Sequence, residues 1–357
     1  MEEILTEEKT VWQRLQEEKR PIALYGMGDG ADKIMAVFQE HGITVREVFA
    51  SDDFVRGHSF HGYRVKSRSE ILKEYDDPVI VLAFASQRPE ILQRFWELER
   101  QYTVYAPDVP VTGTGLFDLS FYSRHKETIR EAYGLLADER SRAVFRDIVN
   151  FKISGKISYL RRCETEKEEI FSRLFFLQND EIFLDLGAYN GDTIRELLEY
   201  TGGQYQKIIA LEPDRKNFRK LSNYVEQAGL CNVALYQMGA WKEKGTLCFA
   251  AKAGRNSALK KADGEKIGVS SVDAILEGQP VSYIKMDVEG AEKEALEGAA
   301  FTLSTYHPKL NIALYHRNED LFAIPLQIQK ITKKYSFYLR HHPYVPAWEV
   351  NLYAVPK

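Results

Sequence analysis

A glycine turn that directly follows a short apolar strand is the strongest chemical signal in the sequence. Residues 183–193 read FLDLGAYNGDT, with Asp185 inside the strand and Gly187 and Gly191 in the turn. Glycine lets the backbone approach a ligand closely, and turns of this kind between a strand and a helix bind nucleotides. The next predicted strand ends at Glu212, the position at which open α/β sheets hold ribose hydroxyls.

The composition of this turn favours one kind of nucleotide ligand. The turn lacks the Gly-Lys-Ser/Thr sequence that binds nucleoside triphosphates, and an acid this early in the turn would repel a pyrophosphate. A ligand that carries an amino-acid tail and a ribose fits better. Tight packing of the strand against the helix would explain the glycines equally well, so the prediction depends on their combination with Glu212.

Charged residues also cluster at the ends of two later strands. Lys285, Asp287 and Glu289 alternate at the end of a predicted strand, and His316 follows another. Carboxylates and histidine can accept a proton from a reacting hydroxyl. An ion pair of Lys285 with an acid, and helix N-terminal acids at Glu289 and Glu292, are the structural alternatives. His316 could also complete a divalent metal site with Asp287 and Glu289, although we expect no bound metal.

Strands and helices alternate in both halves of the chain, which predicts two doubly wound, Rossmann-like α/β domains. We place an N-terminal domain with a leading helix at 1–110, a helical connector at 111–178 and a C-terminal domain at 179–357. The leading helix is predicted over residues 1–19. Strands are predicted at 22–25, 45–50, 79–84 and 102–105, then at 182–186, 208–211, 233–236, 281–286 and 310–314, with an antiparallel pair at 336–340 and 350–355.

A second glycine turn lies in the N-terminal domain. Gly26, Gly28 and Ala31 follow a predicted strand in a G-x-G-x-x-A pattern, and Asp52 follows the next strand. Asp29 inside the turn would disfavour a pyrophosphate. Residues 22–65 resemble the nucleotide-sugar-binding domains of certain sugar-modifying acyltransferases. A binding domain for an activated sugar, a nicotinamide site and a scaffold without a ligand therefore all remain open.

Composition excludes several classes of protein. The formal net charge of −4 over 357 residues leaves no basic surface for nucleic acid. The sequence contains no apolar run long enough to span a bilayer and no signal-peptide pattern, so we expect a cytoplasmic protein. The three cysteines are scattered without metal-ligand spacing. Residues 250–266 are predicted to form a mobile loop over the cofactor or an ordinary surface loop.

Several motifs together resemble FkbM-type methyltransferases. They are LDLGAYNGDT at 184–193, ALEPD at 210–214 and IKMDVEGAE at 284–292, supported by YHRNEDLFAIPL at 315–326 and FYLRHH at 337–342. This resemblance implies the seven-stranded sheet of class I methyltransferases and S-adenosylmethionine as cofactor. It implies a methionine end lined by Asp185, Gly187, Ala188, Asn190 and Gly191, with Glu212 on the ribose and Gly239, Ala240 and Trp241 beside the adenine; Trp241 could equally be a core aromatic.

The expected reaction is therefore O-methylation of a hydroxyl on a small, sugar-like acceptor, either a carbohydrate or a nucleotide sugar. Asp287, Glu289, His316 and Lys285 are the candidate catalytic residues. Two alternatives remain. The chain could be an NAD(P)-dependent oxidoreductase that uses the first glycine turn, or a non-catalytic nucleotide-sugar-binding protein in surface polysaccharide synthesis.

Overall fold

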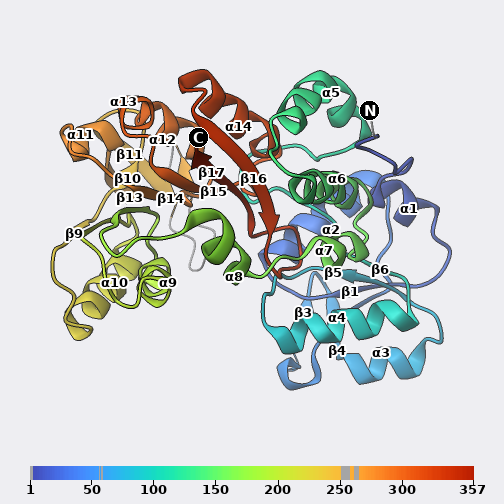
Figure 1. Cartoon of the computed structure of the whole chain (residues 1–357). Helices are drawn as coiled ribbons and strands as arrows, with labels where there is room; N and C mark the ends of the chain where they lie inside the picture. Colours follow the sequence, from blue (N-terminus) through green and yellow to red (C-terminus); the bar gives the residue numbers. More distant parts are fainter. Residues whose placement is uncertain (1–2, 56, 58, 251–257, 261–264) are drawn as a thin grey trace.

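The first of two large sheets belongs to the N-terminal part of the chain (Figure 1). The computed structural model describes residues 3–55, 57, 59–250, 258–260 and 265–357. The strand order is β3-β4-β2-β1-β5-β6, and only β3 runs antiparallel to its neighbour. The central strands are fully buried and apolar, as expected for parallel strands covered on both faces. The strands are β1 (Ile22–Tyr25), β2 (Glu47–Ala50), β3 (Ser59–Phe60), β4 (Tyr63–Ser67), β5 (Val79–Leu82) and β6 (Val104–Tyr105), with helices α2 (Asp29–His41), η1 (Asp52–Phe54), α3 (Arg68–Glu74) and α4 (Pro89–Gln101).

Strands β3 and β4 are additions to the prediction, which placed no strand in 59–67. Burial along β4 is uneven, and Val65 is its one fully buried position. This edge of the sheet therefore lacks the apolar run by which the central strands were recognised.

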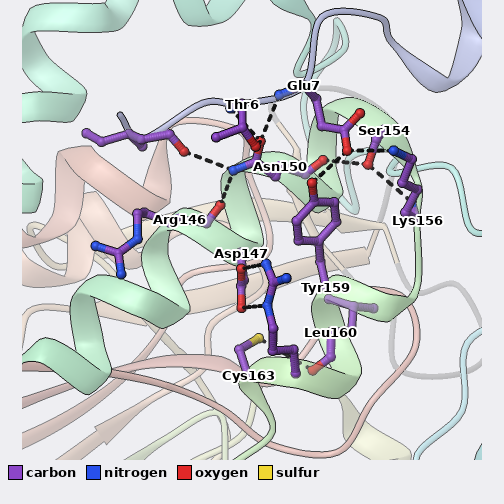
Figure 2. Close-up of polar contacts among 12 residues, drawn as sticks. Thr6, Glu7, Arg146, Asp147, Asn150, Ser154, Lys156, Tyr159, Leu160 and Cys163 are labelled. Carbon is purple, nitrogen blue, oxygen red and sulfur yellow. Dashed lines mark hydrogen bonds and ion pairs between the residues drawn. The ribbon is translucent and has the colours of Figure 1, made fainter. Parts of the chain in front are cut away.

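The leading helix is shorter than the predicted 1–19. Helix α1 covers only Val11–Glu17, because Thr10 caps it through a capping box with Gln13. The preceding residues are held by side chains of the connector (Figure 2). Asn150 accepts hydrogen bonds from the backbone N–H groups of Thr6 and Glu7, at 2.8 and 3.1 Å. These bonds replace the helical hydrogen bonds that the charged, periodic sequence suggested.

The connector helices form a packed layer between the two sheets. Helix α6 is buried along most of its length and packs against α7 and strand β16 of the second sheet. One apolar cluster contains Phe95 of α4, Phe145 of α6 and Phe337 of β16, so the core is continuous. Among the described helices, none has the length and hydropathy to cross a membrane. The connector contains α5 (Leu119–Gly134), α6 (Glu139–Ser154), α7 (Ser158–Cys163), α8 (Lys167–Ile170) and η2 (Phe171–Phe175).

The second large sheet has seven strands in the order β16-β17-β15-β14-β7-β8-β9. The five strands from β15 to β9 are parallel, and β16 and β17 are the predicted antiparallel pair at one edge. The prediction of two α/β sheets with a final antiparallel pair is confirmed. The strands are β7 (Ile182–Leu186), β8 (Lys207–Leu211), β9 (Val233–Tyr236), β14 (Tyr283–Met286), β15 (Lys309–Ala313), β16 (Tyr335–His341) and β17 (Val350–Pro356), with helices α9 (Asp192–Tyr200), α10 (Arg215–Gln227), α12 (Glu292–Glu297), α13 (Ala300–Thr305) and α14 (Asp320–Ile331).

A small third sheet lies where the sequence predicted a loop at 250–266. Its order is β10-β13-β11-β12, and β12 and the start of β13 fall inside that stretch. Residues 251–257 and 261–264 of the predicted loop lie outside the described residues. The strands are β10 (Gly239–Ala240), β11 (Gly245–Ala250), β12 (Ala258–Lys260) and β13 (Glu265–Ser270), followed by helix α11 (Val272–Leu276).

Candidate active site

A cavity of about 320 Å³ lies at the carboxyl edge of the seven-stranded sheet. The turns after β7, β8, β14 and β15 all contribute to it, because the carboxyl ends of parallel strands meet at one edge. The predicted residues that line it are Gly187, Glu212, Gly239, Ala240, Lys285, Asp287, Glu289 and His316. The structure thus brings together most of the strand-end residues that the sequence singled out.

The turn after β7 requires glycine for packing as well as for access. Gly187 has a φ of +87°, and a Cβ at this position would lie 1.9 Å from the backbone oxygen of Asp287. Gly191 has a φ of +85° and packs against Tyr224 without lining the cavity. Both the ligand-approach and the packing explanations therefore apply to Gly187, whereas Gly191 serves the packing of α9 on α10.

Asp185 lies behind the turn and not on the cavity surface. Its side chain is fully buried in β7, and Thr193 donates its hydroxyl hydrogen to Oδ2. Oδ1 has no hydrogen-bond partner among the described residues. Burial raises the pKa of Asp185 to about 7, although Lys285 and Thr193 act in the opposite direction. This carboxyl ties the strand to the first turn of α9.

Glu212, unlike Asp185, lines the cavity. It is 6% exposed and lines the cavity at the end of β8. Its two oxygens accept hydrogen bonds from the backbone N–H groups of Tyr189 and Asp214, both at 2.8 Å. Burial raises the pKa of Glu212 to about 7 against these bonds. Since each carboxylate oxygen has a second lone pair, the group can still accept hydrogen bonds from two ligand hydroxyls.

Four other predicted cofactor residues do not line the cavity. Ala188 is fully buried, and Asn190 accepts a hydrogen bond from Arg195 at the surface. Trp241 packs with Leu247 against Ile267 and Val269. This packing fits the alternative that Trp241 is a core aromatic residue. The fourth is Gly191, described above. The sequence did not single out the neighbouring lining residues Tyr189, Asp192, Thr193, Pro213, Asn217 and Met238, although most follow predicted strands directly.

His316 lies at the centre of a cluster of carboxylates. Its side chain is 1% exposed. Nδ1 is 2.9 Å from an oxygen of Glu292, and Nε2 is 3.4 Å from oxygens of both Asp287 and Glu289. Asp287 also contacts Nζ of Lys285 at 3.1 Å and accepts hydrogen bonds from the Tyr315 hydroxyl at 3.1 and 3.2 Å. Neighbouring charges therefore determine the protonation of this site.

Contacts within the cluster raise the pKa of some of its members and lower the pKa of others. Burial alone would lower the pKa of His316, but Glu292, Glu289 and Asp287 raise it to about 10. Burial alone would raise the pKa of Asp287, but the positive charges of Lys285 and His316 outweigh burial, so the pKa of Asp287 is lowered. Burial, Asp287 and Glu292 raise the pKa of Glu289 to about 8. At neutral pH the site thus holds an imidazolium and an ionised Asp287.

Three side chains of this cluster also have the chemistry of a metal site. Donor atoms of Asp287, Glu292 and His316 lie within 4.8 Å of one another. However, Glu292 is fully buried and accepts the backbone N–H groups of Val288 and Gly290. Both ring nitrogens of His316 already face carboxylates, so an ion would have to displace the imidazolium proton. We interpret the cluster as an ion-pair network.

Removal of divalent metal should therefore leave catalysis intact. After dialysis against EDTA, we expect methyl transfer within about twofold of the untreated rate, because the imidazolium supplies the compensating charge. Initial rates with and without added Mg²⁺ or Mn²⁺ measure this effect. A large loss of rate that either ion restores would contradict the ion-pair interpretation.

The residues of the first glycine turn lie elsewhere. A Cβ on Gly26 would meet Phe84 at 3.1 Å, and Ala31 is fully buried in the apolar core. Gly28 precedes α2, and a Cβ there would meet nothing within 4 Å. Asp52 accepts hydrogen bonds from the backbone N–H and hydroxyl of Ser69 at the start of α3. None of these four residues lines the cavity.

The N-terminal sheet nevertheless reaches the cavity through other residues. Gln87 and Val111, which follow β5 and β6 at its carboxyl edge, line the cavity, as does Lys167 of the connector. The backbone N–H of Thr112 donates to the carbonyl of His316 at 3.0 Å. No sequence pattern marked these residues.

Two solved structures illustrate what this chain is similar to. The structure titled methyltransferase FkbM from Methylobacillus flagellatus KT is 22% identical, with a TM-score of 0.73 over 94% of this chain and 90% of that one. Fibrillarin of Aeropyrum pernix, solved with S-adenosyl-L-methionine, is 12% identical over 50% of this chain and 69% of that one, with a TM-score of 0.33. No curated protein matches the chain. The first likeness shows that the fold, with its seven-stranded sheet, is that of a class I methyltransferase.

The family is identified by the sequence of the C-terminal part. Residues 185–341 match the model described as methyltransferase FkbM domain. This part of the chain is therefore an FkbM methyltransferase domain, and the protein is an S-adenosylmethionine-dependent methyltransferase. The predicted enzyme class and cofactor are confirmed.

Proposed function

We propose that the enzyme transfers a methyl group to a hydroxyl of a small, sugar-like acceptor. One observation carries this proposal: Glu212, the acid suited to bind ribose hydroxyls, lines the same cavity as the carboxylates Asp287 and Glu289. S-adenosylmethionine supplies the methyl group from its sulfonium centre. The protein must then align an acceptor oxygen with that carbon and remove the hydroxyl proton.

The cofactor side of the cavity fits a cationic nucleoside. Glu212 offers two oxygens to ribose hydroxyls, and Gly187 and Tyr189 bring backbone to the cavity surface. Gly239 and Ala240, which form β10 of the small third sheet, line the cavity where an adenine would be held. The surplus of carboxylates in the lining favours a positively charged ligand electrostatically.

Glu289 is the group best suited to accept the proton. The candidate catalytic residues from the sequence include His316, but its raised pKa keeps the imidazole protonated at neutral pH. Glu289 lines the cavity, its side chain is 28% exposed, and its pKa of about 8 makes it a stronger base than an ordinary carboxylate, although Oε2 also pairs with His316 at 3.4 Å. Lys285, Tyr315 and His316 hold Asp287 ionised, so Asp287 can accept a hydrogen bond that orients the acceptor.

A product assay tests the proposal. The enzyme is incubated with S-adenosylmethionine that carries an isotopically labelled methyl group, in the presence of sugars and sugar derivatives. We expect the label in a methyl ether, which NMR identifies by the chemical shift of its carbon. A product labelled at nitrogen or carbon would contradict O-methylation, and a boiled-enzyme control excludes chemical methylation.

A further inference from the structure

An aromatic wall closes one part of the cavity. Tyr315, Tyr344 and Trp348 all line it. The rings of Tyr315 and Trp348 are near parallel at 6.5 Å between centroids, and those of Tyr344 and Trp348 lie 5.7 Å apart. Tyr344 is 4% exposed, whereas Trp348 is partly exposed. Trp348 therefore presents an aromatic surface that the protein itself does not fully cover.

Both halves of the chain position this wall. Trp348 belongs to the segment between β16 and β17. Ser86 and Val345 exchange backbone hydrogen bonds at 2.9 and 3.0 Å, which fasten this segment to the loop after β5 that carries Gln87. Because β17 runs antiparallel to β15, the segment that precedes β17 lies at the carboxyl edge of the sheet, beside His316.

The backbone around the cavity is held in uncommon conformations. Tyr189, Glu289 and Glu349 have φ values of +46°, +56° and +61°, and all three line the cavity. Non-glycine residues adopt such angles uncommonly, because they cost free energy unless the surrounding structure holds them. Glu349 follows Trp348 directly, so this strain brings a carboxylate next to the aromatic surface.

The charges of the lining decide which acceptors it can hold. The acids are Asp192, Glu196, Glu212, Asp287, Glu289 and Glu349. Among the lining residues that the structure describes there is no arginine, and both lysines are paired, Lys167 with Glu196 and Lys285 with Asp287. A diphosphate would meet a surplus of negative charge without a free cation to bind it.

We propose that the aromatic wall, together with Glu349, is the acceptor subsite and that it binds an uncharged sugar ring that carries no nucleoside diphosphate. This inference rests on the proposed function. The apolar C–H face of the ring packs against Trp348, and its hydroxyls donate to the carboxylates of Glu349 and Glu289. The subsite thus disfavours the nucleotide-sugar acceptors that the sequence left open.

Binding to the full chain tests the subsite. The enzyme is saturated with S-adenosylhomocysteine and titrated with methyl glycosides of common hexoses and deoxyhexoses, and separately with UDP-glucose and UDP-N-acetylglucosamine. Saturation-transfer NMR and tryptophan fluorescence report binding. We expect glycosides to bind and the UDP-sugars to bind more weakly. Trp348→Ala should weaken glycoside binding about tenfold, while Trp348→Phe keeps most of it, because the ring face is retained.

Controls separate a subsite from a fold defect. S-adenosylhomocysteine affinity should be unchanged in Trp348→Ala, and Phe54→Ala, which removes an exposed aromatic outside the cavity, should change neither ligand. Binding of UDP-sugars alone, binding of no glycoside, or wild-type glycoside binding by Trp348→Ala would each overturn the inference. A methylated UDP-sugar would overturn it while leaving O-methyl transfer intact, whereas an N- or C-methylated product would overturn the proposed function instead.

Discussion

The Glu289→Gln variant should turn over its acceptor about a hundredfold more slowly than the wild-type enzyme, the size of effect expected when a general base is lost. Glutamine keeps the shape of the side chain and cannot accept the proton. The substitution removes the 3.4 Å ion pair of Oε2 with Nε2 of His316, but Asp287 and Glu292 still flank the imidazolium. The variant should therefore fold and bind S-adenosylhomocysteine normally, with the loss confined to kcat.

The pH dependence of the rate identifies the same group. The base must be ionised to act, and the pKa of Glu289 lies near 8. The wild-type kcat/KM, which reports the pKa values of the free enzyme, should therefore fall about tenfold per pH unit as pH drops below this value, because the protonated fraction rises. Initial rates between pH 6 and 9.5 measure this limb, which should be absent in Glu289→Gln.

The control for Glu289→Gln is a nearby glutamate that does not line the cavity. Glu297→Gln, in the same segment of the chain but exposed at the end of α12, should leave rate and pH profile unchanged. If Glu289→Gln kept the wild-type limb while Asp287→Asn removed it, the base would be Asp287. A limb centred near pH 10 would point back to His316.

Loss of the Glu212 carboxylate should abolish useful cofactor binding. Each hydrogen bond to a charged group is worth about 1.5–3 kcal/mol, so two lost ribose contacts should weaken S-adenosylhomocysteine binding about a hundredfold or more. In Glu212→Gln, the amide NH₂ would also face the backbone N–H of Tyr189 or Asp214, both of which need an acceptor. Isothermal titration calorimetry with S-adenosylhomocysteine gives the affinity.

Thermal unfolding separates the binding role of Glu212 from its structural one. Glu212 anchors the turns after β7 and β8, so Glu212→Gln should also lower the melting temperature. Glu226→Gln on the exposed side of α10 is the control and should change neither quantity. Wild-type affinity in a Glu212→Gln protein would show that the ribose is held elsewhere.

The N-terminal half contributes residues to the cavity lining, but these residues are not those of its glycine turn. Gly26 and Asp52 are accounted for by packing and by the start of α3, which supports the scaffold interpretation of that turn. Gln87 and Val111 instead extend the carboxyl edge of the first sheet to the cavity that we propose as the active site. Substitutions in these two loops should therefore change acceptor preference more than cofactor affinity.

Local signals in the sequence were sufficient to predict the strands and turns that form the proposed cofactor side of the cavity. Alternating apolar segments predicted the parallel strands, and the turn at Gly187 and the acid at Glu212 both follow strands directly. Parallel strands bring their carboxyl ends to one edge of a sheet, so residues at strand ends can be placed together before any contact is known. The same reasoning grouped Asp287, Glu289 and His316 correctly.

Only the tertiary structure decided the protonation of the charged residues in the cavity and the set of residues that form the proposed acceptor subsite. His316 is an imidazolium because carboxylates from another segment surround it, and pKa values depend on such distances, which a sequence pattern does not contain. Asp185 points behind its turn because Thr193 holds it there. Gln87, Lys167 and Trp348 come from three distant parts of the chain and meet only because both sheets and the connector share one core.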